Sequence, residues 1–230
     1  MAIARPEVPS GLVAVPVRTP LVQRGDDLAA IAADATAGIA RSGDVIAISE
    51  TALAIAQGEY LAAEYIRPSR LAYALCRRAG ALATVSQPES MQLVIDLAGR
   101  AKVLLAAVAH IAGRAIGRRG AFYEVMGGAL AAIDGYTGTM PPFERAIVLA
   151  PRAPDAFAQA VYARSGIGCA VVDANDLERA RVLGASMGVA RNVVAAALLD
   201  NPGGNADEQT PIVVLKWRAP GPNPLFEAAA

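Results

Sequence analysis

The chain has 230 residues, of which 54% are hydrophobic, so it holds enough apolar material for one large domain or a tight two-lobed unit. Lysine plus arginine and aspartate plus glutamate both number 21, which leaves no net charge. Without a long-range field of one sign, binding to nucleic acid or to an anionic membrane is not favoured, and we expect neither as a partner.

Two cysteines, Cys76 and Cys169, each lie in an apolar run, which favours buried thiols in a reducing compartment over a disulfide framework. The first ten residues lack the apolar core of a signal peptide. The most apolar stretch, residues 103–116, is interrupted by His110 and Arg114 and is too short to span a bilayer. We therefore expect a cytoplasmic protein in which this stretch is a buried helix.

Strand and helix patterns alternate along the chain. Short apolar runs predict strands over residues 11–17, 44–49, 146–149, 169–172 and 211–215. Helices are predicted from the Asp26–Asp27 cap to about residue 39, from Pro68 to 79, from Pro88 to 97, and over 154–164 and 190–199. This alternation predicts an α/β (mixed α+β) fold with a single domain over residues 1–220. Residues 221–230, with their prolines and alanines, are expected to be a flexible C-terminal tail.

The motifs of several common enzyme classes are absent from the sequence. There is no G-x-x-x-x-G-K-[ST] loop, no G-x-G-x-x-G turn and no G-x-S-x-G elbow. The chain has one histidine, His110, which we expect to be a packed core residue rather than a catalytic one. Chemistry must therefore depend on carboxylates, hydroxyls, arginines and a metal bound by oxygen ligands.

Four polar segments lie beside apolar runs: residues 49–51, 134–139, 173–176 and 205–210. Ligands of α/β sheets usually bind at the carboxyl ends of strands, where converging carboxylates can hold Mg²⁺ or Mn²⁺. The alternative is that these residues only terminate strands and cap turns. We favour this structural role for each segment taken alone, except for residues 173–176, where the two interpretations weigh equally.

Taken in order, several segments are similar to those of one enzyme family. Residues 17–28 (VRTPLVQRGDDL) look like its opening segment, and residues 44–58 (DVIAISETALAIAQG) like its second strand and the helix after it. Residues 88–96 resemble one of its helices, residues 168–173 match a strand that ends in aspartate, and residues 206–208 match its late Ala-Asp-Glu. In this order the chain resembles the coenzyme F420-0:gamma-glutamyl ligases.

The resemblance implies a mixed α/β fold that forms an intertwined homodimer, with GTP (or another nucleotide) and Mg²⁺ or Mn²⁺ as cofactors. It implies that a small-molecule carboxylate is activated as an acyl phosphate and then attacked by the amine of an amino acid. Carried over to this sequence, the candidate catalytic residues are Asp173 and Glu208, and the candidate metal ligands are Asp134, Asp173, Asp176 and Asp207. The candidate nucleotide-binding residues are Ser49, Glu50, Thr51, Arg118 and Arg119.

The sequence also departs from the family pattern. Where the family has Ser-Lys after the second strand, this chain has Ser49-Glu50, and Tyr136 or Thr137 stands at the place of a metal-associated aspartate. A histidine of the family is missing, and the residues after Asp173 differ. The leading hypothesis is a nucleotide- and metal-dependent ligase. The alternatives are a small-ligand-binding or regulatory protein that has lost catalysis, or a structural subunit of a hetero-oligomer, which the apolar helices of residues 71–116 suggest.

Overall fold

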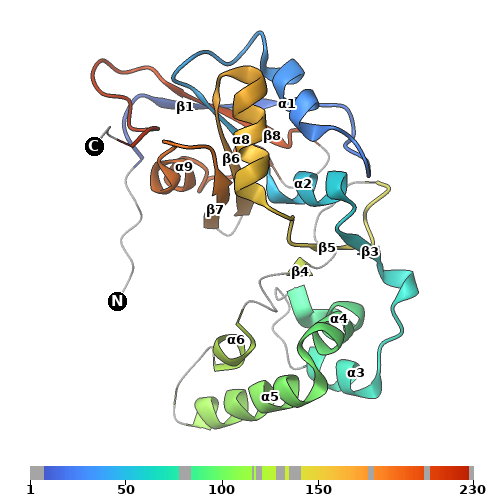
Figure 1. Cartoon of the computed structure of the whole chain (residues 1–230). Coiled ribbons are helices and arrows are strands. Elements are labelled where there is room, and N and C mark those ends of the chain that lie inside the picture. Colours follow the sequence, from blue (N-terminus) through green and yellow to red (C-terminus); the bar gives the residue numbers. More distant parts are fainter. Residues whose placement is uncertain are drawn as a thin grey trace. The chain divides into compact units, whose positions relative to one another are not determined.

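The computed structural model describes residues 8–77, 84–115, 117, 121–127, 133–134, 141–175, 179–204 and 208–227. The chain forms two compact units, one of residues 1–58 and 151–230 and one of residues 59–150 (Figure 1). Both units contain strands and helices, so the prediction of a mixed α/β fold is confirmed. Each unit is described by itself below.

The first unit is built on a five-stranded sheet with the order β1-β8-β2-β6-β7. Its strands are β1 (Leu12–Val17), β2 (Val45–Ser49), β6 (Gly168–Asn175), β7 (Arg179–Ala185) and β8 (Ile212–Trp217). β2 and β6 are parallel, and the other neighbouring pairs are antiparallel. The sequence predicted four of these strands but not β7, because its run RARVLGA has two arginines and a glycine and therefore lacks the continuous apolar stretch that marked the other four.

Helices cover both faces of this sheet. They are α1 (Leu28–Thr36), α2 (Glu50–Gln57), α8 (Pro154–Ser165) and α9 (Arg191–Ala197). Alternate residues of β6, Ala170 and Val172, pack with Val194 and Leu198 of the α9 segment. The other face is covered by α8, because a side chain on Gly184 of β7 would point into its first turn. Neighbouring strand residues therefore face different helices.

The close packing of α8 against β7 involves a glycine and a β-bulge in β7. The pairing of β6 with β7 shifts between Val171 and Val172, so that one residue of β7 stands without a partner. Beyond the shift, Gly184 comes so close to α8 that a Cβ there would lie 2.3 Å from the carbonyl carbon of Pro154. Only a residue without a side chain allows this approach.

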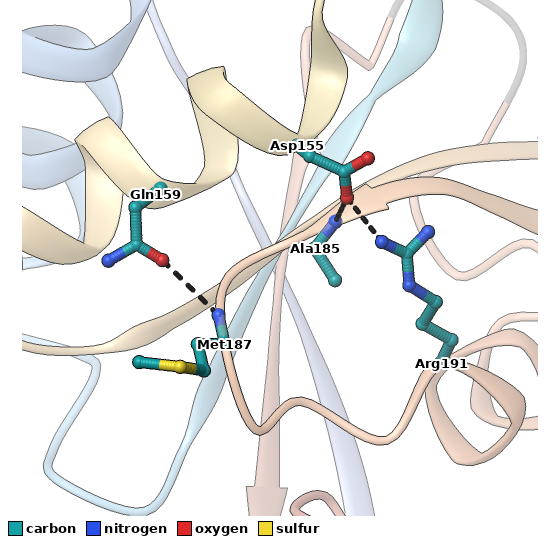
Figure 2. A network of polar contacts seen from close by, with 5 residues as sticks. All are labelled: Asp155, Gln159, Ala185, Met187 and Arg191. Atoms are coloured by element: carbon teal, nitrogen blue, oxygen red, sulfur yellow. Dashed lines mark hydrogen bonds and ion pairs between the residues drawn. The ribbon is translucent and has the colours of Figure 1, made fainter.

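Polar contacts fix the same junction (Figure 2). The Asp155 carboxylate at the start of α8 accepts a 2.9 Å hydrogen bond from the backbone N–H of Ala185 and forms an ion pair with Arg191. These two contacts, the backbone bond first, hold the pKa of Asp155 below its usual value, against a smaller opposing effect of burial. One turn further along α8, the side chain of Gln159 accepts a hydrogen bond of 3.2 Å from the N–H of Met187.

The C-terminal segment is packed rather than flexible over the residues that the structure describes. Leu225 is fully buried, and its carbonyl accepts a 2.8 Å hydrogen bond from the N–H of Ala190. The N–H of Glu227 donates to the carbonyl of Gly188 at the same distance. The prediction of a flexible tail is therefore wrong for residues 221–227, because their apolar side chains complete the core beneath α9.

The second unit has a three-stranded sheet with the order β3-β5-β4, formed by β3 (Tyr60–Ala62), β5 (Ala146–Leu149) and β4 (Ile133–Asp134). Its helices are α3 (Arg70–Cys76), α4 (Pro88–Ala98), α5 (Arg100–Ala115) and α6 (Ala121–Met126), with 3₁₀ turns at Ala63–Tyr65 and Thr84–Ser86. The largest contribution to the core comes from α4, with Met91, Leu93, Val94 and Ile95. Both cysteines of the chain are free and buried, Cys76 in this unit and Cys169 in the first, as the sequence predicted.

Two predictions for the helices of the second unit need correction. Pro88 is the first residue of α4, as expected, but Pro68 precedes α3 by one more residue, because Ser69 caps the helix through a 3.3 Å bond from the N–H of Ala72. The predicted buried helix, α5, buries only one face. Its other face exposes large apolar side chains, namely Leu104 (48%), Leu105 (61%), Val108 (63%) and Ile111 (66%).

His110, expected in the packed core, is half-buried on α5. Helix α5 is apolar on most of its surface, which is typical of a helix with contacts on several sides. Within the described part of the chain, no helix has the length and the apolar character needed to cross a membrane.

Candidate functional site

The candidate site lies at one end of the five-stranded sheet, where β2 ends at Ser49 and β6 continues beyond it to Asn175. Because the two strands are parallel, they run toward the same side of the sheet, and Ser49 at the end of β2 is the register partner of Val172 in β6. β8 runs the opposite way, so its first residues reach the same edge. The N–H of Ser49 donates a 2.8 Å hydrogen bond to the carbonyl of Pro211, which fixes the start of β8 beside the end of β2.

Asp173 is the predicted site residue that this geometry places best. It follows Val172 directly and therefore lies one residue beyond the register partner of Ser49. The side chain is partly buried, and burial raises the pKa of the Asp173 carboxyl, while the charge of Arg181 acts in the opposite direction. Keeping a partly buried carboxylate charged costs free energy, and carboxylates with such a raised pKa are typical of functional sites.

The three predicted nucleotide-binding residues after β2 form the start of α2. Ser49 is the N-cap residue, but its side chain makes no capping hydrogen bond. Glu50 is in the first turn, where a negative charge stabilises the positive end of the helix dipole. Thr51 is half-buried in the same turn. Glu50 thus has a structural reason for its place, although its charge would repel a phosphate bound there.

Glu208 reaches the same edge through the segment before β8. Its backbone carbonyl accepts a 3.1 Å hydrogen bond from Nε of Arg18, just after β1. Its carboxylate folds back over Gly204, where a Cβ would lie 2.8 Å from both carboxylate oxygens. The backbone at Gly204 has a φ of +74°, a conformation that favours glycine. The sequence analysis quoted the segment of Arg18 but assigned this residue no role.

The side chains of the other predicted site residues lie outside the part of the chain that the structure describes. Arg118, Arg119, Asp176 and Asp207 lie outside the described residues. Asp134 is the last residue of β4 in the second unit, and its side chain also lies outside the described part. The structure therefore places Ser49, Glu50, Thr51 and Asp173 near the end of β2, and Glu208 in the segment that leads into β8 beside it.

The donors at this edge suit a hard divalent cation, because they are carboxylate and hydroxyl oxygens. Among the described residues, no group of three histidine, cysteine, aspartate or glutamate side chains could hold a metal ion by itself. Asp173 and Glu50 are the two described carboxylates next to the end of β2, and Glu50 belongs to the first turn of α2. A complete metal site there needs further oxygen ligands, such as those predicted at Asp176 and Asp207.

The described cavity lies elsewhere. It has a volume of about 390 Å³ and is lined by Val8, Pro9, Ser10 and Trp217, at the start of β1 and the end of β8. Because β8 is antiparallel to β2, this is the edge opposite Asp173. The indole N–H of Trp217 is buried there without a hydrogen-bond partner among the described residues. We place the chemistry at the Asp173 edge, where the charged and polar side chains are.

The family model of the F420-0:Gamma-glutamyl ligases matches residues 16–171, more than half of the chain. The match begins in β1, includes the whole second unit and ends in β6, just before Asp173. No match was found among curated proteins.

Proposed function

Because the chain belongs to the F420-0:gamma-glutamyl ligase family, we propose that it forms an amide bond between a carboxylate and an amino acid, driven by a nucleoside triphosphate. The observation that carries this proposal is the position of Asp173, which follows Val172, the register partner of Ser49 at the carboxyl end of β2. Open α/β sheets bind their ligands in this position. The buried free thiols, Cys76 and Cys169, suit the reducing cytoplasm, where we place the reaction.

The proposed reaction has two steps. A carboxylate oxygen of the acceptor attacks the γ-phosphorus of GTP or another nucleotide, and the nucleoside diphosphate leaves. The amine nitrogen of the amino acid then attacks the acyl carbon, and phosphate leaves as the amide forms. The amine must lose a proton in this step, and we assign its removal to Glu208 or Asp173. A carboxylate can act in this way once it is within hydrogen-bond reach of the amine.

Charge neutralisation is the main requirement of such a site, because a triphosphate and two carboxylate substrates come together. We assign the metal to Asp173 with Asp176 and Asp207, and with Asp134 as a further candidate ligand. When bound, Mg²⁺ or Mn²⁺ would supply positive charge beside the phosphate oxygens. Arg118 and Arg119 would add cations, and Ser49 and Thr51 hydroxyl groups, next to the negative charge of Glu50.

A second candidate function is a small-ligand-binding or regulatory protein that no longer turns over a nucleotide. The observation that favours it is the position of the Glu208 carboxylate, which folds over Gly204 within its own loop. Under this function a nucleotide or a small anion binds, but no phosphate is released in the presence of carboxylate acceptors and amino acids.

We also propose that the protein is a homodimer. The support is the family membership together with the exposed apolar face of α5, which a partner chain would cover. Sedimentation velocity of the wild-type chain and of Leu105→Glu tests this. A dimer that the substitution weakens supports the proposal, whereas a monomer that needs a different protein to stay soluble would favour the structural subunit of a hetero-oligomer.

The experiment that tests the proposed ligase site is thermal unfolding with GTP, GDP, ATP or ADP, each with and without Mg²⁺ or Mn²⁺. A ligand that binds only the native state raises the unfolding midpoint by mass action. We expect a rise with one nucleotide plus metal, lost in Asp173→Ala and kept in Asp34→Ala, an exposed carboxylate near the end of α1. No rise under any condition would contradict the nucleotide site.

A further inference from the structure

One arginine of the edge strand β7 faces the candidate site. In the antiparallel pairing of β6 with β7, Arg181 is the register partner of Asp173. Residues directly opposite one another in such a pair project from the same face of the sheet. Their neighbours, Val172 and Ala180, pack toward α9, so Asp173 and Arg181 project from the other face. The two charged side chains are thus neighbours on the face that α2 and α8 cover.

The two side chains differ in their surroundings. Asp173 is partly buried, whereas Arg181 is exposed and lies on the last strand of the sheet. Among the described residues, the side chain of Arg181 forms no hydrogen bond and no direct ion pair, and it acts on the Asp173 carboxyl through its charge. The five N–H donors of its guanidinium group are therefore open to a ligand.

We propose that Arg181 binds an oxyanion of the substrate, a phosphate or a carboxylate group, beside Asp173. This inference rests on the proposed function, because it extends the site at the end of β6. The planar guanidinium group matches both kinds of oxyanion through two parallel hydrogen bonds. From the rim of the site, Arg181 binds the ligand group whose negative charge would otherwise meet Asp173.

A purely protective role is the competing explanation, because charged residues on edge strands also prevent sheets from pairing with other chains. Such a role needs a charge at this strand but no contact with a ligand. A measurement of ligand affinity therefore distinguishes the two explanations, whereas a measurement of unfolding stability does not.

The test compares the full-length wild type with Arg181→Ala, Arg181→Gln and Arg181→Lys. The matched control is Arg218→Ala. Arg218 is an exposed arginine just after β8, at the opposite end of the same sheet, and its backbone N–H donates a hydrogen bond to the carbonyl of Gly11. Isothermal titration measures the affinity for GTP and ATP with Mg²⁺, for inorganic phosphate and for L-glutamate. Circular dichroism checks that each variant is folded. Arg181→Gln keeps a polar side chain in place of the charge if Arg181→Ala does not fold.

We expect the loss of the Arg181 charge to weaken binding of one class of probe by about 10- to 100-fold, the range for a hydrogen bond between charged groups. Arg181→Lys should lose less, and Arg218→Ala should bind like the wild type. A loss for nucleotides and phosphate assigns Arg181 to a phosphate, and a loss for L-glutamate alone assigns it to a carboxylate. Unchanged affinity for every probe overturns the role of Arg181 only. A wild type that binds none of the probes overturns the proposed function and this inference together.

Discussion

The close contact between α8 and β7 predicts a large loss of stability for Gly184→Ala. A Cβ at this position would lie 2.3 Å from the carbonyl carbon of Pro154 and 2.4 Å from the nitrogen of Asp155. Both are backbone atoms, so no side-chain rotation relieves the clash. To reach ordinary contact, α8 must move away from β7 by roughly 1 Å, and closely packed interiors resist such a shift.

The expected cost follows from this displacement. Overpacking of a core usually costs about 1–3 kcal/mol, and the movement of α8 also strains the hydrogen bond from Ala185 to Asp155. We expect Gly184→Ala to lower the free energy of unfolding by about 3 kcal/mol, at the upper end of the range for a single substitution. The matched control is Gly38→Ala, where a Cβ meets no atom within 4 Å. Its effect should stay within about 0.5 kcal/mol.

The chain provides its own probe for this measurement. It contains one tryptophan, Trp217, which lies on β8 in the same sheet as Gly184. Urea unfolding followed by tryptophan fluorescence therefore reports on the first unit, and a lower midpoint at constant slope measures the lost stability. If Gly184→Ala unfolded at the same urea concentration as Gly38→Ala, α8 would not rest on β7 as described.

Three further predictions use the same unit or compare it with the second. Burial raises the pKa of Asp173 in the folded state, so the charged carboxylate lowers the free energy of unfolding once the pH rises above the pKa that Asp173 has in the unfolded chain. Near pH 7, Asp173→Asn should therefore unfold at a higher urea concentration than the wild type. The same variant should lose the metal-dependent rise of the thermal unfolding midpoint with nucleotide. Lys216 Nζ lies 3.7 Å from the carboxylate of the buried Asp44, which also accepts a hydrogen bond from the N–H of Arg41. Lys216→Met should lower the free energy of unfolding by about 3 kcal/mol in the same urea titration, because the buried carboxylate of Asp44 loses its cationic partner. The double variant Lys216→Met with Asp44→Asn should recover part of this loss. Cys169 and Cys76 are both buried, and burial raises the pKa of the Cys169 thiol far above its usual value. Neither cysteine should therefore react with a thiol reagent in the native protein. In urea, the labelling rate of Cys169 should report the opening of the first unit, and that of Cys76 the opening of the second.

Local signals in the sequence predicted much of the first unit. The β-branched run of residues 44–49 became β2, and Asp27 caps α1 by accepting a hydrogen bond from Ala30, as its place before an apolar run indicated. Such signals act between residues close in the chain, so they can be read without the fold. The buried strand before Asp173 was predictable for the same reason, but the predicted strand stopped at residue 172, whereas β6 continues through Asp173 to Asn175 in its pairing with β7.

Features that depend on distant residues were not predictable. The order of the strands places β8 between β1 and β2, although nearly the whole chain separates it from them. The packing of Leu225 under α9 also requires the complete sheet. For the same reason the sequence analysis did not find Arg181. Its place opposite Asp173 follows from the register of β6 and β7, and the register is set by the tertiary contacts of both strands.

Two aspartates of the first unit show which carboxylate the fold uses for its own stability. Asp155 has a lowered pKa, because a backbone N–H and an arginine stabilise its charged form, and these contacts fasten α8 to β7. Asp173 has a raised pKa, because burial disfavours its charge more than Arg181 favours it. In pH terms, the contribution of Asp155 is present above its unfolded pKa and is lost as the pH falls, whereas the charge of Asp173 costs stability over the same range. A residue that only ended a strand could be an asparagine or a serine without this cost. We therefore propose that the aspartate at position 173 binds a cation or a substrate group through its charge.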